Sequence, residues 1–236
     1  MTPDDAAQRL PHDDARPVRK GAVPAPAVQR LSLYLRELEA LLKQDRQTVS
    51  SKQLGETLGL TDAQVRKDLT YFGQFGHPGV GYRVDELIVR IRRILGTDHT
   101  WNGLLVGAGN LGRALLSYRG FFSKGFRIVA AFDRDPSVQG QRLGAPPGVE
   151  VMPLERLAEV VAERDIQIAI LCVPAEAAQE VADCLTQTGI KGILNFAPAS
   201  LSVSDSVAMA SVDLSVRLEQ LAFRISASEV VKEHNA

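Results

Sequence analysis

The stretch LLVGAGNLGRALLSY, residues 104–118, decides the fold of the second half of this chain. Residues Gly107 to Gly112 read G-x-G-x-x-G, directly after a short apolar strand and before a helix that we expect to run to about Tyr118. In this fingerprint the first glycine makes a tight turn, the second lets a pyrophosphate approach the backbone, and the third lets helix pack on strand. The phosphates then lie at a helix N-terminus. We therefore expect a Rossmann-like domain that binds a dinucleotide.

An acidic residue at the end of the next strand, FRIVAAFD, supports this interpretation. Asp133 follows Gly112 by 21 residues, the place where a carboxylate accepts hydrogen bonds from the adenosine ribose. Arg134 comes next and could pair with the 2′-phosphate of NADP(H). Because the carboxylate stands first and would repel that phosphate, NAD(H), as NADH or NAD⁺, is the favoured cofactor.

Alternating strand and helix patterns continue to residue 198 and predict an α/β, doubly wound parallel sheet. Ligands of such sheets lie beyond the carboxyl ends of the strands. We therefore expect the segments after two apolar strands to line the nicotinamide side, although their prolines could simply turn the chain. The predicted cofactor-binding residues are Gly107, Ala108, Gly109, Asn110, Leu111, Gly112, Asp133, Arg134, Val173, Pro174, Asn195, Phe196, Ala197 and Pro198.

The preceding residues have the pattern of a winged helix. A first helix, from Val28 to Lys43, has one apolar stripe of four leucines: Leu31, Leu35, Leu38 and Leu42. Two short helices follow, each opening on a capping-box pattern, Ser50 with Gln53 and Thr61 with Gln64. Two short helices joined by a turn of this length indicate a helix-turn-helix.

The second of these helices, from Asp62 to about Phe72, should present a polar face to base edges and phosphates. The glycine-rich segment 73–81 predicts a tight hairpin, or wing, whose backbone can approach a phosphate closely. Residues 27–97 hold 11 Lys and Arg against 8 Asp and Glu, which mildly favours an anionic partner. An ordinary solvated helix surface is the alternative. The predicted DNA-binding residues are Ser51, Lys52, Gln64, Arg66, Lys67, Thr70, Tyr71, Gly79, Gly81 and Tyr82.

The composition excludes several classes of protein. The 236 residues are 45% hydrophobic and 23% charged, with a net charge of −1 and no apolar run long enough to span a membrane. The first 26 residues lack the apolar core of a secretory signal and should form a disordered tail. Cys172 and Cys184 have no partner at metal-ligand spacing, so we expect two buried structural thiols, no metal, and a reducing cytoplasmic location.

No catalytic constellation is visible after the fingerprint. No histidine lies between Asp133 and Glu233 to donate a proton, and no substrate domain follows. We therefore expect a nucleotide sensor and not an enzyme. The last apolar stripe, in VDLSVRLEQLAFRIS, favours burial against a second chain, because helix-turn-helix proteins read palindromes as dimers. The expected organisation is a tail over 1–26, a winged helix over 27–97, a Rossmann domain over 98–213 and a dimerisation helix over 214–236.

Three motifs together resemble the Rex family, bacterial repressors that sense the NADH/NAD⁺ ratio. They are VRKDLTYFGQFGHPGVGY (65–82), the fingerprint with FD at 132–133, and GIKGILNFAP (189–198). The resemblance covers about residues 27–226. It implies a homodimer with the C-terminal helix swapped between subunits, binding to palindromic double-stranded operator DNA in the presence of NAD⁺, and release of that DNA when NADH binds.

The resemblance also implies a switch in which Asp213 exchanges partners between Tyr118 and Arg36. A surface ion pair with Glu39 is the simpler role for Arg36. Three other functions remain open: a small NAD-dependent oxidoreductase with a regulatory DNA-binding domain, a regulator that responds to coenzyme A, and a DNA-binding dimer with a vestigial nucleotide site. The missing catalytic groups argue against the first, Asp133 against the second, and the intact fingerprint against the third.

Overall fold

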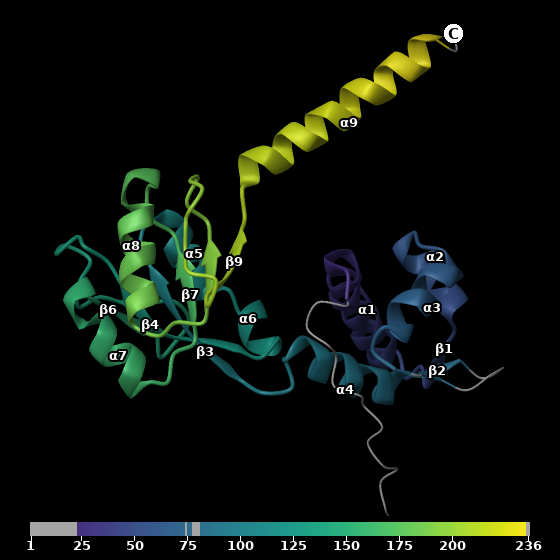
Figure 1. Ribbon diagram of the computed structural model, residues 1–236, viewed down its shortest axis with the longest axis horizontal. Coiled ribbons are helices and arrows are strands. Elements are labelled where there is room, and N and C mark those ends of the chain that lie inside the picture. Colours follow the sequence, from purple (N-terminus) through teal and green to yellow (C-terminus); the bar gives the residue numbers. More distant parts are fainter. Residues whose placement is uncertain (1–22, 74, 77–80, 235–236) are drawn as a thin grey trace, which may run out of the picture. The chain divides into compact units, whose positions relative to one another are not determined.

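The computed structural model describes residues 23–73, 75–76 and 81–234, with side chains described to residue 226 (Figure 1). Most of the predicted tail and the predicted DNA contact Gly79 lie outside the described residues. The chain forms two compact units that divide after Asp98, and each is described by itself.

The first unit is a helix-turn-helix on a longer helix, with a two-stranded sheet. Its elements are α1 (Ala25–Lys43), β1 (Thr48–Val49), α2 (Ser51–Leu58), α3 (Asp62–Thr70), β2 (Tyr82–Arg83) and α4 (Val84–Leu95). Helix α1 begins three residues before the expected start, with Pro24 at its N-cap. Its core side includes Tyr34, whereas Leu42 is 43% exposed, because Leu41 packs against the core in the last turn. The predicted stripe is therefore wrong at Leu42.

The two helix starts were predicted alike but differ. At α2 the capping box is confirmed: the Ser50 hydroxyl accepts from the Gln53 N–H (3.1 Å), and the Gln53 side chain accepts from the Ser50 N–H (2.9 Å). At α3 the Thr61 hydroxyl accepts from the Gln64 N–H (3.1 Å), but the Gln64 side chain turns to a different partner, described below. The second box is therefore only half formed.

Residues 74 and 77–80 of the predicted hairpin lie outside the described residues, and the strand that follows it, β2, is described. This strand pairs antiparallel with β1, at the start of the helix-turn-helix. Gly81 makes the close approach at this pairing: its φ is +87°, and a Cβ there would lie 2.6 Å from the Val49 carbonyl oxygen. Only glycine fits both requirements.

The second unit is a seven-stranded sheet in the order β5-β6-β4-β3-β7-β8-β9. All neighbours pair parallel except β5 with β6. Without the antiparallel β5, this is the strand order of dinucleotide-binding folds. The strands are β3 (Trp101–Val106), β4 (Phe126–Phe132), β5 (Arg142–Leu143), β6 (Val149–Met152), β7 (Ile168–Leu171), β8 (Gly192–Asn195) and β9 (Ala208–Ser211). The predicted α/β fold is confirmed, and β5 and β9 are additions to the expected elements.

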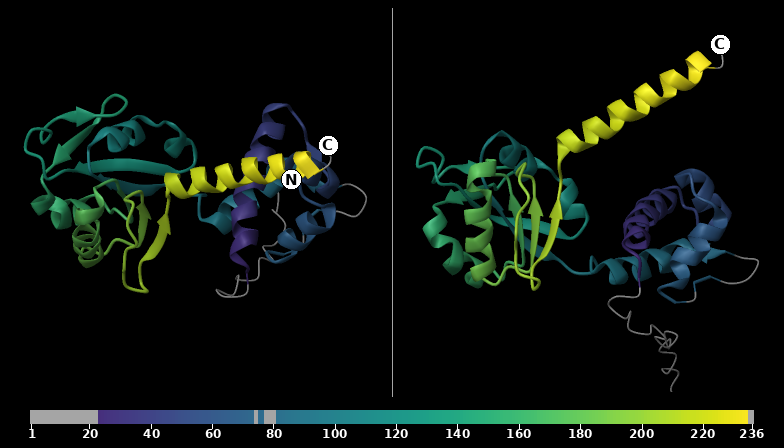
Figure 2. Two further views of the ribbon diagram at one scale, coloured as in Figure 1. Left: turned by 90° about the horizontal axis from the view of Figure 1, so that it is seen from above. Right: turned by 45° about the horizontal axis from the view of Figure 1, so that its top comes forward.

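Helices cover both faces of this sheet (Figures 1 and 2). On one face, α7 (Leu157–Glu163, after the 3-10 turn Leu154–Arg156) and α8 (Ala175–Gln187) bury the larger core against alternate residues of the central strands. The other face carries a smaller cluster that includes Ala131 and Leu116 of α5 (Asn110–Ser117). The short helix α6 (Gly120–Ser123) follows α5. Successive residues of β4 face these two cores in turn. Both faces of the strand are therefore buried, which explains why its sequence is continuously apolar.

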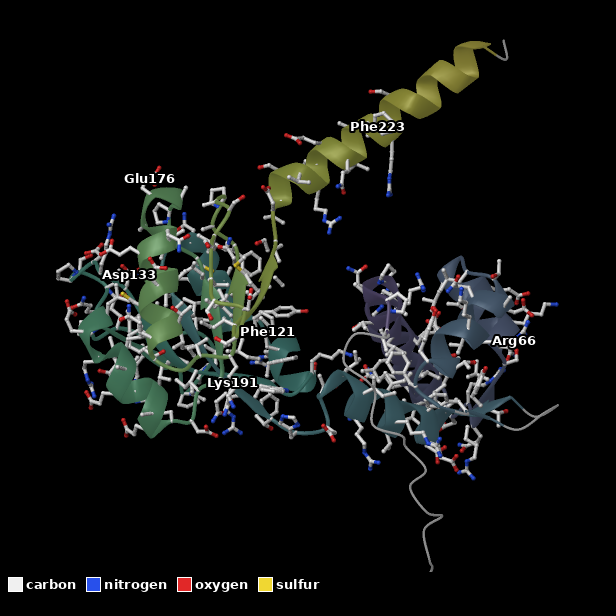
Figure 3. All side chains as sticks on the ribbon, in the orientation of Figure 1. Arg66, Phe121, Asp133, Glu176, Lys191 and Phe223 are labelled. Carbon is white, nitrogen blue, oxygen red and sulfur yellow. The ribbon has the colours of Figure 1, made fainter. Side chains whose placement is uncertain are left out.

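The last helix, α9 (Leu214–His234), follows β9 and is longer than its apolar stripe. Its described side chains, residues 214–226, are all exposed, including Phe223, which is 74% exposed (Figure 3). Five further apolar residues are at least 42% exposed: Leu214, Val216, Leu218, Leu221 and Ile225. A helix with this much exposed apolar surface marks an interaction surface.

We predict that Gly55→Ala destabilises the first unit. A Cβ on Gly55, inside α2, would lie 2.6 Å from the Leu60 carbonyl oxygen of the turn to α3. Helix propensity alone would favour alanine by about 1 kcal/mol, whereas overpacking costs about 1–3 kcal/mol. The free energy of unfolding, measured in urea, should therefore fall. Glu56→Ala, at the exposed neighbouring position, is the control; equal or greater stability of Gly55→Ala would refute the close packing.

Candidate functional site

Two glycines of the fingerprint are required by the packing of the protein itself. Gly107, between β3 and α5, has φ +99°, and a Cβ there would overlap the Cys172 carbonyl oxygen at the end of β7. A Cβ on Gly112 would overlap the carbonyl oxygen of Gly107. The turn is thus pressed against its own helix and a neighbouring strand, as the spacing of the motif predicts.

The middle glycine is different. Gly109 is exposed, has a negative φ of −69°, and a Cβ on it would meet nothing within 4 Å. Nothing in the packing explains its lack of a side chain, so the open space over it suits a ligand that must touch backbone. Gly109 is also the N-cap of α5, which has no side-chain cap, and its first-turn N–H groups suit a diphosphate.

Asp133 lies directly after β4 and is fixed against the turn (Figure 3). Its Oδ2 accepts a hydrogen bond from the Ala108 N–H (2.6 Å), and its Oδ1 accepts one from the Asp135 N–H (2.9 Å). A carboxylate can accept about four hydrogen bonds, so sites remain for two ribose hydroxyls. Arg134, which follows Asp133 and was also predicted to bind the cofactor, is exposed.

Arg113 holds the same turn from its other side and was missed by the sequence analysis. Its Nε donates to the Ala108 carbonyl oxygen (3.0 Å), and its Nη2 donates to the Gln141 side chain (3.4 Å). The Ala108 residue is therefore held at both its N–H, by Asp133, and its C=O, by Arg113. An arginine directly after the third glycine was the available signal, but its helix position alone does not show that it folds back.

The segments after β7 and β8 lie at the same edge of the sheet as the turn, since β3, β7 and β8 are parallel neighbours. Val173 and Phe196 are half-buried, Ala197 is buried, and Pro174 and Pro198 are exposed. Asn195 is fully buried: its side chain accepts from the Ala197 N–H (2.8 Å) and donates to the Ala199 carbonyl (3.0 Å). Asn195 thus shapes the loop after β8, and its predicted contact with the cofactor stays a prediction.

The two cysteines have different surroundings. Burial raises the pKa of the half-buried Cys172 to about 12, which leaves an inert thiol. Cys184 is exposed, since Val181, Ala182 and Leu185 fill the core side of α8, so the prediction of two buried thiols is wrong there. In the described part of the chain no group of three or more His, Cys, Asp or Glu could hold a metal, and no helix is long and apolar enough to cross a membrane.

The structure describes the three predicted switch residues separately. Tyr118 ends α5, is 60% exposed, and meets the Phe121 ring edge-on with 5.1 Å between centroids. Asp213 caps α9, accepting from the N–H groups of Ser215 and Val216 at 2.8 and 3.2 Å. Arg36 is exposed on α1, in the other unit, and its suggested partner Glu39 pairs instead with Arg92 (2.9 Å).

The predicted DNA face lies mainly on α3. Arg66 reaches Asp62 (2.7 Å) and the Ser51 hydroxyl (3.1 Å), and so ties the start of α3 to α2 (Figure 3). Lys67, Thr70 and Tyr71 are exposed, and so is Lys52 of α2, 3.9 Å from Glu56. Tyr82 is only 9% exposed and belongs to the core of the first unit, and its predicted contact with DNA stays a prediction.

A fully buried carboxylate, missed by the sequence analysis, lies beneath this face. Asp68 of α3 accepts hydrogen bonds from both Nε and Nη2 of Arg30, from the Tyr34 hydroxyl (2.7 Å) and from the Gln64 amide nitrogen (2.7 Å). Burial alone would raise the pKa of Asp68, but these hydrogen bonds outweigh it and hold the pKa below its ordinary value. The ionised group thus anchors α3 to α1.

We predict opposite effects for alanine at two glycines of the turn. Gly109→Ala should unfold like the unaltered protein, since its Cβ meets nothing, yet bind a dinucleotide at least tenfold more weakly because the methyl group occupies the approach to the backbone. Gly112→Ala should lower the free energy of unfolding, since its Cβ overlaps backbone. Calorimetry with NADH and urea unfolding measure the two effects. Unchanged NADH affinity in Gly109→Ala would show that the dinucleotide does not bind at this turn.

Two family models and several solved structures match this chain. Residues 22–70 match a family model described as the N-terminus of a putative DNA-binding protein, and residues 98–199 match one described as a CoA binding domain. Among solved structures, RSP in complex with NAD⁺ and operator DNA superposes with a TM-score of 0.83 at 41% identity, over 89% of this chain and 96% of that one. RSP in complex with NADH gives 0.80 at 40% identity, over 90% and 98%.

Curated relatives cover nearly the same residues. The redox-sensing transcriptional repressor Rex of Carboxydothermus hydrogenoformans is 50% identical over 203 residues, which are 86% of this chain and 96% of that protein. Rex of Desulforamulus reducens is 47% identical over 207 residues, 88% and 97% of the two chains. At this identity and coverage, the chain belongs to the Rex family of redox-sensing transcriptional repressors.

Proposed function

We propose that this chain is a redox-sensing repressor that binds operator DNA through α3 and leaves it when NADH binds at the α5 turn. The main observation behind this proposal is the open space over the Gly109 backbone, beside the carboxylate of Asp133, which is held by the Ala108 N–H. Together these two features fit an adenosine diphosphate. The proposal is supported by the RSP structures, one with NAD⁺ and operator DNA and one with NADH.

The carboxylate also supports NAD(H) over two related ligands. Asp133 suits a ribose with free hydroxyls, because these can donate to its remaining acceptor sites. NADP(H) carries a 2′-phosphate and coenzyme A a 3′-phosphate on that ribose, and either would be repelled by the carboxylate. Coenzyme A remains the competing ligand because one matched family model bears its name.

The direct test measures operator binding while NADH, NAD⁺, NADPH or coenzyme A is added. NADH should release the DNA, NAD⁺ should leave it bound, and the other two should act only at much higher concentrations. If coenzyme A released the DNA at a lower concentration than NADH, coenzyme A would replace NADH as the proposed ligand. Oxidation of NADH by an added carbonyl substrate would favour the oxidoreductase alternative.

Helix α9 supports assembly as a homodimer. Its apolar side chains are exposed along the described length, so a second copy could bury them, with the helix exchanged between the subunits. A two-fold dimer places two copies of α3 on the half-sites of a palindromic operator.

The signal must come from the nicotinamide end of the ligand. A ligand shifts an equilibrium only by its differential affinity for the two states. Moving the dimer from a 99:1 to a 1:99 ratio of DNA-competent to released states requires NADH to prefer the released state by about 10⁴, roughly 5.5 kcal/mol. Two sites per dimer would each supply about half, which a few redirected hydrogen bonds and one ion-pair exchange can provide. Tyr118, exposed at the end of α5, is the residue we assign to this step, with Asp213 and Arg36 as its partners.

We predict that Tyr118→Phe separates binding from release. The ring contact with Phe121 is kept and the phosphate turn is untouched, so both nucleotides should bind, whereas NADH should release operator DNA poorly. Asp213→Asn, which preserves the cap of α9 because asparagine also caps helices, should add little to it, since both act on one switch. Operator release that proceeds normally in Tyr118→Phe would show that the signal takes another route.

We predict that Lys67→Ala weakens binding to all DNA sequences alike. The salt slope is the slope of the logarithm of DNA affinity against the logarithm of salt concentration. Loss of one phosphate contact should lower its magnitude by about one. Lys43→Ala, an exposed lysine at the end of α1, is the matched control and should leave the slope unchanged. Equal slopes for Lys67→Ala and the unaltered protein would place Lys67 away from the phosphates.

A further inference from the structure

The buried carboxylate of Asp68 controls which group one side chain of α3 can offer to DNA. Arg30 and Tyr34 bind it from α1, and Gln64 binds it from one turn earlier on α3. The cluster therefore fixes the position of α3 against α1 and, at the same time, the orientation of the Gln64 side chain. Gln64 itself is only partly buried, between the exposed residues Ala63 and Lys67.

The chemistry of this contact fixes which end of the Gln64 amide faces inward. An ionised carboxylate only accepts hydrogen bonds, so the group 2.7 Å from Asp68 Oδ1 must be the amide nitrogen Nε2. The two hydrogen bonds from the Arg30 guanidinium hold Asp68 in its ionised form. The carbonyl oxygen Oε1, on the other side of the amide carbon, is consequently turned away from Asp68.

We propose that Asp68 is a positioning residue that makes Gln64 present its carbonyl oxygen to the operator, so that Gln64 selects a base with an amino group on its major-groove edge. This inference rests on operator binding through α3, proposed above. In the major groove only adenine N6 and cytosine N4 donate, whereas guanine and thymine present acceptors. The second N–H of the amide can also reach N7, which favours adenine of the two.

The position of Gln64 in the helix supports this role. It is the third residue of α3, and the N-terminal residues of a recognition helix are those that contact base edges. A glutamine without a partner could turn its amide over and accept or donate as the base required. Held by Asp68, it can discriminate, because the wrong base would place two acceptors against each other.

The test compares the base preferences of variants. DNA is selected from a random pool by the full-length protein and by Gln64→Ala, Gln64→Glu and Asp68→Asn, and each position of the selected half-site is then varied. The unaltered protein should prefer adenine or cytosine at one position per half-site. Gln64→Ala should lose that preference, a change on the order of tenfold in relative affinity, and keep the others.

The other two variants separate orientation from mere presence of a side chain. Gln64→Glu should still prefer an amino-bearing base, because a carboxylate only accepts, although total affinity falls through repulsion from the phosphates and from Asp68, which loses the donor at 2.7 Å. Asp68→Asn frees the amide to turn, so the same position should lose its preference while the salt slope stays unchanged. A structural role alone would change total affinity and stability but not the preference at a single base pair.

Each failure points to a different error. If the unaltered protein selects no sequence, operator binding itself is wrong. If it selects an operator that NADH releases, but Gln64→Ala keeps every preference or Gln64→Glu changes to guanine or thymine, only the present inference falls. Loss of preference in Gln64→Ala but not in a folded Asp68→Asn would overturn the role of Asp68. Should Asp68→Asn not fold, the outcome for Gln64→Glu decides.

Discussion

The close approach of the β3–α5 turn to the backbone around it is the constraint on which the second unit depends. Gly107 lies against the end of β7 and Gly112 lies against Gly107, so a side chain at either position would overlap a carbonyl oxygen. Because β3 lies between β4 and β7, this packing places the N-terminus of α5 at the switch point of the sheet. The proposed anion site is a consequence of how the central strand connects to its helix.

Patterns that act over a few residues were sufficient to predict most of this architecture. The fingerprint, the capping box at Ser50 and the apolar runs of β3, β4 and β7 each depend on neighbours in the chain. Pairings between distant segments were not accessible. Strand β2 pairs with β1, which precedes the helix-turn-helix, and β9 has four exposed residues with no apolar pattern. Strands this short show no periodicity that could be distinguished from a loop.

The same limit applies to the candidate site. Asp133 follows from its spacing, but Arg113 and Asp68 act through partners that a one-dimensional pattern does not bring together. Asp68 resembles an ordinary charged residue on a helix surface until Arg30 and Tyr34, on another helix, are placed beside it. The sequence also does not show that Tyr82 and Asn195, polar residues within predicted sites, are buried, where they pack in the core or hold a loop.

Affinity and signal are assigned to opposite ends of one ligand. NAD⁺ and NADH share the adenosine and the pyrophosphate, so the contacts proposed at Gly109 and Asp133 would favour both redox states equally and shift no equilibrium. Discrimination therefore has to come from groups near the nicotinamide, where the ring loses its charge on reduction. The turn at Gly107 to Gly112 is held at Ala108 by both Asp133 and Arg113, whereas Tyr118, which we propose as a switch residue, is exposed. Under the proposed function, an anchor at the shared end of the ligand and a switch at its nicotinamide end would let a ligand present in both forms report the ratio between them.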